Sequence, residues 1–344
     1  MGRPDSLPGW ATVDAATDYR VFRLVSFRRL SFVTAALISL LGFLGLILGA
    51  DWLVRGSSRL AAQFGISPLA IGLTVVAYGT SAPEMVASLV AAATGHPEIT
   101  VGNVLGSNIA NVGLILGAAA VVTPLAVAPT VLRRELPFMV GVTLLFGLLG
   151  FFAFRFPIGR GVGLASIGLL IVFNLLSLRW ARTDAGGTSE AAPSEGDSLS
   201  RNSMLTILGL ALLLGGAQLL VAGAVSVARA IGLSEFIIGV TLVAVGTSLP
   251  ELATSVAAGM RGQADLLIGT IVGSNVFNIL GALGLSALVR PIAIDASLLR
   301  FEFSALIGFT LVTALFLYTG KRLVRWEGAF LLCGYVAFIA LLLR

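Results

Sequence analysis

The chain has 344 residues, of which 57% are hydrophobic and only 11% are charged, and its mean hydropathy is +1.00. A soluble domain carries roughly 25% charged residues, so this composition excludes a soluble globular protein and predicts a polytopic membrane protein. The net charge of +5 comes from arginines at the ends of apolar segments. That placement is typical of loops at a membrane surface and does not predict nucleic-acid binding.

A single histidine and a single cysteine limit the chemistry further. They disfavour a zinc site and a His-dependent catalytic triad, and they exclude an intrachain disulfide. Residues 1–31 contain five arginines and no long apolar core. We expect them to form a polar N-terminal tail and not a cleaved signal.

After this tail, apolar segments long enough to cross a hydrocarbon core of ~30 Å recur along the chain. We expect five helices in residues 32–181, a hydrophilic linker rich in Gly, Ser and Pro at 182–202, and five more helices in 203–344. The expected helices cover residues 32–54, 68–94, 101–123, 137–154, 158–180, 203–229, 236–260, 266–288, 302–319 and 326–343.

The two halves contain a repeated sequence. Residues 67–117 align with residues 234–284 without a gap at a constant offset of 167, and 21 of the 51 aligned positions are identical. An odd number of crossings per repeat places the two copies in opposite orientations. The expected fold is therefore an all-α polytopic membrane protein of ten transmembrane helices, built as two inverted five-helix repeats.

The arginines also predict an orientation in the membrane. Among the loops after the tail, 11 Lys and Arg residues fall on the side of the 182–202 linker and 6 on the other side. This asymmetry places the linker in the cytoplasm and both termini outside. The five arginines of the tail oppose this assignment and make the totals equal. The short linker and the lack of a signal peptide fit a prokaryotic inner membrane.

The first copy of the repeat contains the motif AYGTSAPE at residues 77–84. On a helix, Ala77, Ser81 and Glu84 share one face, and Thr80 lies one turn before Glu84. Pro83 lacks an N–H group, so the carbonyl of Gly79 loses its donor, and we expect carbonyls near Ala77 to be exposed as well. Hydroxyl, carbonyl and carboxylate oxygens are the ligands of hard cations such as Ca²⁺ and Na⁺.

The second copy reads AVGTSLPE at residues 244–251 and places Ala244, Thr247, Ser248 and Glu251 at the matching positions. A proline-kinked helix with back-bonded hydroxyls is the structural alternative. A carboxylate near the centre of a bilayer costs ~3 kcal/mol or more, so it is rarely retained without a partner. Two glutamates at matching repeat positions therefore favour a shared cation site.

A second motif follows in each half, GSNIAN at residues 106–111 and GSNVFN at residues 273–278. Ser107 and Asn111 are four residues apart and share a helix face, as do Ser274 and Asn278. These side chains can complete a coordination shell without adding charge. Their neighbours are expected to serve helix packing instead; these are Asn108 and Asn275.

At these motifs the chain resembles the cation/calcium exchanger superfamily, and within it the prokaryotic type of the sodium/calcium exchanger family with two alpha repeats. The resemblance implies alternating access around a midplane site that binds Na⁺ or Ca²⁺ in turn, with Glu84 and Glu251 as the shared carboxylates. It implies no cofactor, since Ca²⁺ and Na⁺ are the transported ions, and no obligatory protein partner besides the lipid bilayer. The other implied ligands are Ala77, Thr80, Ser81, Ser107, Asn111, Ala244, Thr247, Ser248, Ser274 and Asn278.

The chain departs from some relatives at Asn278, where archaeal and potassium-dependent exchangers carry Asp. Two carboxylates give the site a formal charge of −2, which one Ca²⁺ or two Na⁺ would cancel. Stoichiometry and electrogenicity therefore stay open. The missing Asp argues mildly against potassium dependence.

Three functions are compatible with these motifs to different degrees. Exchange of Ca²⁺ for Na⁺ is favoured, because the hydroxyl-rich motifs offer neutral oxygens that a proton carrier does not need. Ca²⁺/H⁺ exchange on the same scaffold is the alternative, because protons should compete for buried Glu84 and Glu251. An intramembrane hydrolase with Ser81 or Ser248 as nucleophile is a remote third hypothesis, since neither motif supplies a base.

Overall fold

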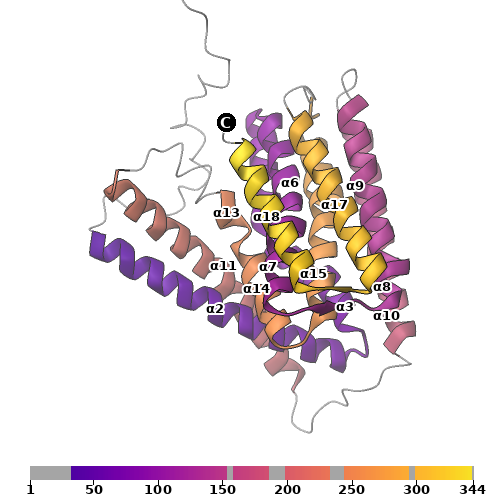
Figure 1. The fold of residues 1–344 in the computed structure, drawn as a ribbon, viewed down its shortest axis with the longest axis horizontal. Coiled ribbons are helices and arrows are strands. Elements are labelled where there is room, and N and C mark those ends of the chain that lie inside the picture. The colour runs from indigo at the N-terminus through magenta and orange to yellow at the C-terminus, as the bar shows by residue number, and fades with distance from the viewer. Residues whose placement is uncertain (1–31, 153–157, 186–197, 233–243, 294–298, 343–344) are drawn as a thin grey trace, which may run out of the picture.

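The computed structural model describes residues 32–152, 158–185, 198–232, 244–293 and 299–342, and these residues are almost entirely helical (Figure 1). Three of the helices contain π-helical turns, η3 (Gly72–Val76), η4 (Asn111–Ile115) and η7 (Phe277–Ala282). The α-helices are α2 (Phe32–Gln63), α3 (Pro68–Ile71), α4 (Ala77–Thr80), α5 (Ala82–Thr94), α6 (Pro97–Ala110), α7 (Leu116–Val122), α8 (Pro129–Arg133), α9 (Glu135–Phe152), α10 (Arg160–Ala185), α11 (Leu199–Ala230), α13 (Ala244–Thr247), α14 (Leu249–Met260), α15 (Ala264–Val276), α16 (Leu283–Val289), α17 (Arg300–Gly320) and α18 (Arg325–Leu342).

The expected all-helical membrane fold is confirmed in the described residues. Seven helices there are long and apolar enough to cross a membrane, and the pair Pro68–Thr80 and Ala82–Thr94, bent by 49°, makes an eighth. The count of ten crossings stays a prediction. The expected helix at 236–260 is described only from Ala244 onward, and the tail and most of the linker lie outside the described residues.

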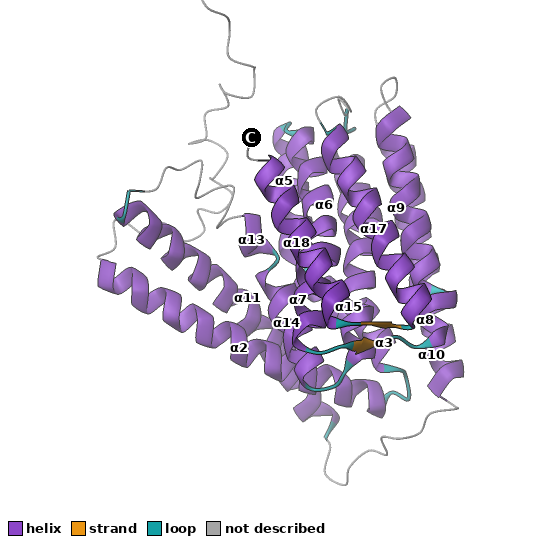
Figure 2. Ribbon diagram, viewed as in Figure 1, coloured by secondary structure: helices purple, strands orange, loops and turns teal. Residues whose placement is uncertain are grey.

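Helices α2 and α11 lie side by side and are tilted away from the upright bundle formed by α6, α9, α17 and α18 (Figures 1 and 2). Glycines let the two backbones approach closely. A Cβ atom added to Gly216 of α11 would lie 2.5 Å from the backbone nitrogen of Leu46, and one added to Gly49 of α2 would lie 2.3 Å from that of Leu213. Small residues at such contacts are a usual device of membrane helices, since lipid supplies no hydrophobic drive for association.

The two halves of the chain are interleaved. Strand β1 (Leu125–Ala126) pairs antiparallel with β2 (Arg322–Leu323), as Figure 2 shows, and Ile158 forms a bridge with Ile292. Position 292 is position 125 plus the repeat offset of 167. The segment after α7 in the first half thus pairs with the segment before α18 in the second half, and the segment after α16 pairs with the one before α10. Such reciprocal contacts are typical of a twofold relation.

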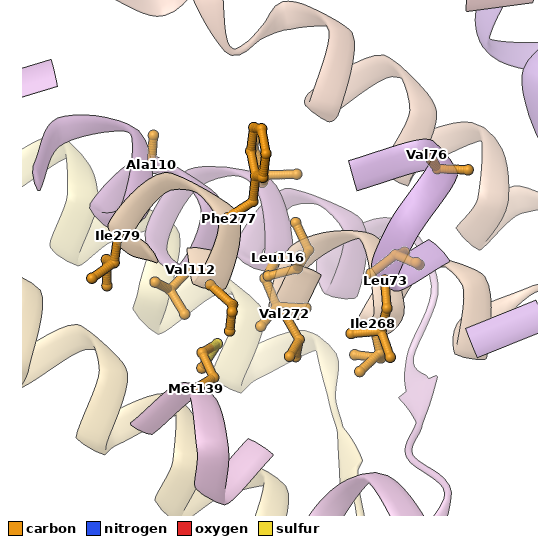
Figure 3. Close-up of a cluster of buried hydrophobic side chains, with 14 of the residues drawn as sticks. Leu73, Val76, Ala110, Val112, Leu116, Met139, Ile268, Val272, Phe277 and Ile279 are labelled. Carbon is orange, nitrogen blue, oxygen red and sulfur yellow. The ribbon is translucent and has the colours of Figure 1, made fainter. Parts of the chain in front are cut away.

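The buried centre is formed by the helices that carry the repeat motifs. Leu73 and Val76 of η3 lie near Ile268 and Val272 of α15 in a cluster that also contains Val112, Leu116 and Met139 (Figure 3). Helix α15 is buried along its length from Leu266 to Val276. The polar residues of both motifs therefore lie inside the protein and not against lipid.

Candidate cation-binding site

Both GTS-x-PE motifs break their helix at the same residue. Ser81, between α4 and α5, has φ −85° and ψ 6°, and Ser248, between α13 and α14, has φ −91° and ψ 5°. The proline of each motif lies at the start of the second helix, where its missing N–H has no cost. Each break therefore places a glutamate in the first helical turn, Glu84 in α5 and Glu251 in α14. There the helix dipole favours negative charge.

The two glutamates come together in the centre of the protein. Glu84 is 2% exposed and Glu251 is 1% exposed, and Ser81, three residues before Glu84, is hydrogen-bonded to Oε1 of Glu251. Each has a buried carboxylate oxygen, Oε2, without a hydrogen-bond partner. Buried carboxylate oxygens without a donor are strongly unfavourable, and a bound cation would remove that cost.

Serine and asparagine side chains of the two halves are hydrogen-bonded to one another, and one of the serines also bonds a glutamate. The Ser81 hydroxyl donates to Oε1 of Glu251 at 2.9 Å and is hydrogen-bonded to Oγ of Ser274, also at 2.9 Å. Asn278 donates from Nδ2 to Oγ of Ser107 at 3.1 Å, and its Oδ1 has no partner. The structure thus joins Ser81, Ser274 and Glu251 in one set of hydrogen bonds, and Asn278 and Ser107 in another, each of which spans the two halves.

Two of the expected ligands, Thr80 and Asn111, are engaged by their own helix or by another asparagine. The Thr80 hydroxyl donates to the carbonyls of Val76 at 3.0 Å and Ala77 at 3.3 Å. Asn111 donates from Nδ2 to Oδ1 of Asn275 at 2.9 Å. Asn275, expected to serve packing, therefore contacts an expected site residue directly.

The expectation of a free carbonyl at Ala77 was wrong. This carbonyl accepts the backbone N–H of Ser81 at 2.9 Å. The helix continues through Thr80, so proline removes the donor only from the carbonyl four residues earlier, which is that of Gly79. In the second half, Ser248 is buried and Thr247 is partly exposed. The side chain of Ala244 lies outside the described part.

Two contacts near the site gave no signal in the sequence. Asn103 donates from Nδ2 to the carbonyl of Glu84 and to Oγ of Ser88, both at 2.9 Å. Tyr78 stacks on Phe277 with ring centroids 4.3 Å apart. The repeat does not reveal either contact, because the aligned positions carry different residue types; these are Thr270 for Asn103, Val245 for Tyr78 and Ala110 for Phe277.

Comparison with known proteins gives consistent matches over most of the chain. The sequence profile of the family described as sodium/calcium exchanger protein matches residues 34–179 and again residues 202–344. A putative antiporter, CaxA, from Alkalimonas amylolytica is 39% identical, covering 90% of this chain and 99% of the relative. The sodium/calcium exchanger MaX1 of Methanosarcina acetivorans is 33% identical, covering 89% and 97%.

Further relatives and solved structures agree with these matches. The inner membrane protein YrbG of Escherichia coli is 36% identical, covering 90% of this chain and 96% of the relative. Among solved structures, the sodium-calcium exchanger NCX_Mj soaked without Na⁺ and Ca²⁺ superposes with a TM-score of 0.78 and 33% identity. That match covers 90% of this chain and 99% of the exchanger.

Proposed function

Because this chain belongs to the sodium/calcium exchanger family of integral membrane proteins, we propose that it exchanges Ca²⁺ for Na⁺ by alternating access around Glu84 and Glu251. Its family makes it a cation antiporter and not an enzyme. The single observation that carries the proposal is the meeting of two buried glutamates, one from each half, each with a carboxylate oxygen that lacks a donor.

The charge of the site supports a divalent cation. In the described part of the chain, acidic side chains, histidines and cysteines do not gather in groups of three or more that could hold a metal. The two glutamates are then the only formal charges that we assign to the site, and one Ca²⁺ or two Na⁺ would neutralise them. The oxygens of Ser81, Ser107, Ser274 and Asn278 would complete the shell as neutral ligands.

The coupling ion separates this proposal from Ca²⁺/H⁺ exchange on the same scaffold. The site offers several neutral oxygens besides its carboxylates. A Na⁺ ion can use these oxygens, whereas a proton needs only one carboxylate. This composition favours Na⁺ as the coupling ion.

For the arrangement in the membrane, we propose two inverted repeats, residues 32–181 and 203–344, joined by a cytoplasmic linker with both termini outside. The support is the excess of Lys and Arg on the linker side and the reciprocal pairing of Leu125 with Leu323 and of Ile158 with Ile292. We place the protein in a prokaryotic inner membrane, in keeping with its Escherichia coli relative.

Uptake of ⁴⁵Ca²⁺ into proteoliposomes tests the coupling ion. We expect rapid uptake when the lumen holds Na⁺, and little uptake when it holds K⁺ or when only a pH gradient is imposed. Uptake driven by the pH gradient and indifferent to Na⁺ would replace the proposal with Ca²⁺/H⁺ exchange.

The substitution Asn278→Asp tests the charge of the site. We expect the variant to keep Ca²⁺ binding but to shift the Na⁺ and pH dependence of exchange, because a third carboxylate changes the formal charge of the site from −2 to −3. The measurement is the initial rate of Na⁺-driven ⁴⁵Ca²⁺ uptake across a range of pH and Na⁺ concentration. Profiles that superpose on those of the unsubstituted protein would show that Asn278 only packs.

A further inference from the structure

The polar network between the two halves is asymmetric although its residue types are repeated. We propose that Asn108 and Asn275 are alternating positioning residues, each accepting a hydrogen bond from the site asparagine of the other half, one at a time. Asn275 holds Asn111 in the described state, and Asn108 holds Asn278 in the opposite access state. The inference rests on the proposed function, since it concerns how the exchange site passes between its two states.

In the described state both the oxygen and the nitrogen of the Asn275 amide have a partner. Its Oδ1 accepts from Nδ2 of Asn111 at 2.9 Å, across the two halves. Its own Nδ2 points at Sδ of Met139, 3.6 Å away. Because the amide nitrogen of Asn275 points at Met139, its amide oxygen points the other way, at Asn111. Asn275 and Asn111 are both buried. Asn275 thus fixes the orientation of a residue at the site.

Asn108 holds the equivalent position in the other half but lacks the equivalent bond. Its Nδ2 donates to the carbonyl of Val104, in its own helix, at 2.7 Å, and its Oδ1 is buried without a partner. Asn278, the counterpart of Asn111, donates instead to Ser107. A buried amide oxygen without a donor is unfavourable, and Asn278 is the donor that the repeat assigns to it.

The serines of the site show the same inequality. Ser81 is hydrogen-bonded to Glu251 and to Ser274, both in the other half. Its counterpart Ser248 is buried and described, yet it makes neither of the equivalent bonds, to Glu84 and to Ser107. The cross-half bonds among the serines, glutamates and paired asparagines therefore each have an equivalent between residues of the same type that the described state does not make, whereas Met139 corresponds to Leu306 and has no such equivalent.

Identical residue types make the exchanged network chemically available. In the exchanged network Ser248 is hydrogen-bonded to Glu84 and to Ser107. Asn111 then donates to Ser274, and Asn278 donates to Asn108. In inverted repeats, exchanging the conformations of the two halves converts a state open to one side into a state open to the other. In each state the amide oxygen of one of the two positioning residues lacks a donor, so this exchange of one hydrogen bond does not by itself favour either network.

The test uses Ca²⁺ self-exchange in membrane vesicles of both orientations, which needs access from both sides but no particular coupling ion. The half-saturating Ca²⁺ concentration is measured on the outer and inner faces, and their ratio reports the access equilibrium. We expect Asn275→Leu and Asn108→Leu to shift this ratio about fivefold in opposite directions, which corresponds to about 1 kcal/mol for one buried hydrogen bond. The double variant should return near the original ratio.

Controls separate this effect from simple loss of packing. Ser286→Ala removes a buried hydroxyl that lies outside the network and has no hydrogen-bond partner. This variant should leave the ratio of the two half-saturating concentrations unchanged. If a leucine variant fails to assemble, Asn275→Ser and Asn108→Ser provide a second pair of variants. The serine side chain is shorter than asparagine, so its hydroxyl should not reach the asparagine of the other half. Shifts in the same direction, or no shift in either pair, would overturn the proposal. Absence of any Ca²⁺ exchange in the unsubstituted protein would instead refute the proposed function.

Discussion

Replacing Glu84 or Glu251 by Gln is expected to abolish Ca²⁺ exchange while the protein still folds. Both glutamates are buried and contribute a carboxylate oxygen that has no protein donor. A unit charge 4 Å from a carboxylate gains about 4 kcal/mol at an effective dielectric constant of ~20, so a divalent cation loses at least that much with the charge. This loss corresponds to nearly a thousandfold in affinity. The measurement is ⁴⁵Ca²⁺ uptake into proteoliposomes loaded with Na⁺.

Glu98→Gln is the matched control for this prediction. Glu98 lies in the first turn of α6, and its side chain is 60% exposed. The same chemical change there should leave uptake unaltered. Folding of each variant is checked by its elution profile and thermal unfolding in detergent. Substantial exchange by either buried variant would exclude a site that needs both carboxylates.

Replacing Gly216 by Ala is expected to destabilise the protein through the contact between α2 and α11. The new methyl group would lie 2.5 Å from the backbone nitrogen of Leu46 and 2.8 Å from the carbonyl oxygen of Gly42. Neither atom can move without shifting α2 as a whole. Overpacking of this kind costs about 1–3 kcal/mol, and we expect a melting temperature lower by several degrees.

The adjacent glycine provides the control. A Cβ atom at Gly215 would meet no other atom within 4 Å, so Gly215→Ala adds the same methyl group to the same turn of α11. Because alanine is the better helix former, this variant should be as stable as the original or slightly more so. Thermal unfolding of the two variants in one detergent decides the matter. Equal melting temperatures would show that the close approach of the helices adds nothing to stability.

Much of the fold could be predicted from the sequence because a membrane protein carries its constraints in composition and length. Apolar segments had to be helices, since only a helix satisfies its own backbone in lipid. The repeat offset then predicted that Glu84 and Glu251 would meet. The offset could not predict how α2 and α11 pack. The sequence does not distinguish a glycine that contacts the backbone of the other helix from one that faces open space.

The sequence led to candidate residue types for the site but not to their hydrogen bonds. Ser81, Ser107, Ser274 and Asn278 could be found because they recur in both halves. A repeated sequence predicts equal roles, whereas the structure gives unequal ones, with Asn275 engaged and Asn108 not. Asn103 was missed for the opposite reason, because its aligned residue, Thr270, carries a different side chain and donates only to its own helix.

The reciprocal bridges between the halves have a consequence for biosynthesis. Leu125 pairs with Leu323, and Ile158 forms a bridge with Ile292. While only the first half of the chain has been synthesised, neither pairing can form. During that interval Glu84 lacks Glu251 and Ser274, which only the second half of the chain supplies. The ribosome has made more than nine-tenths of the polypeptide before the last of these pairs can close.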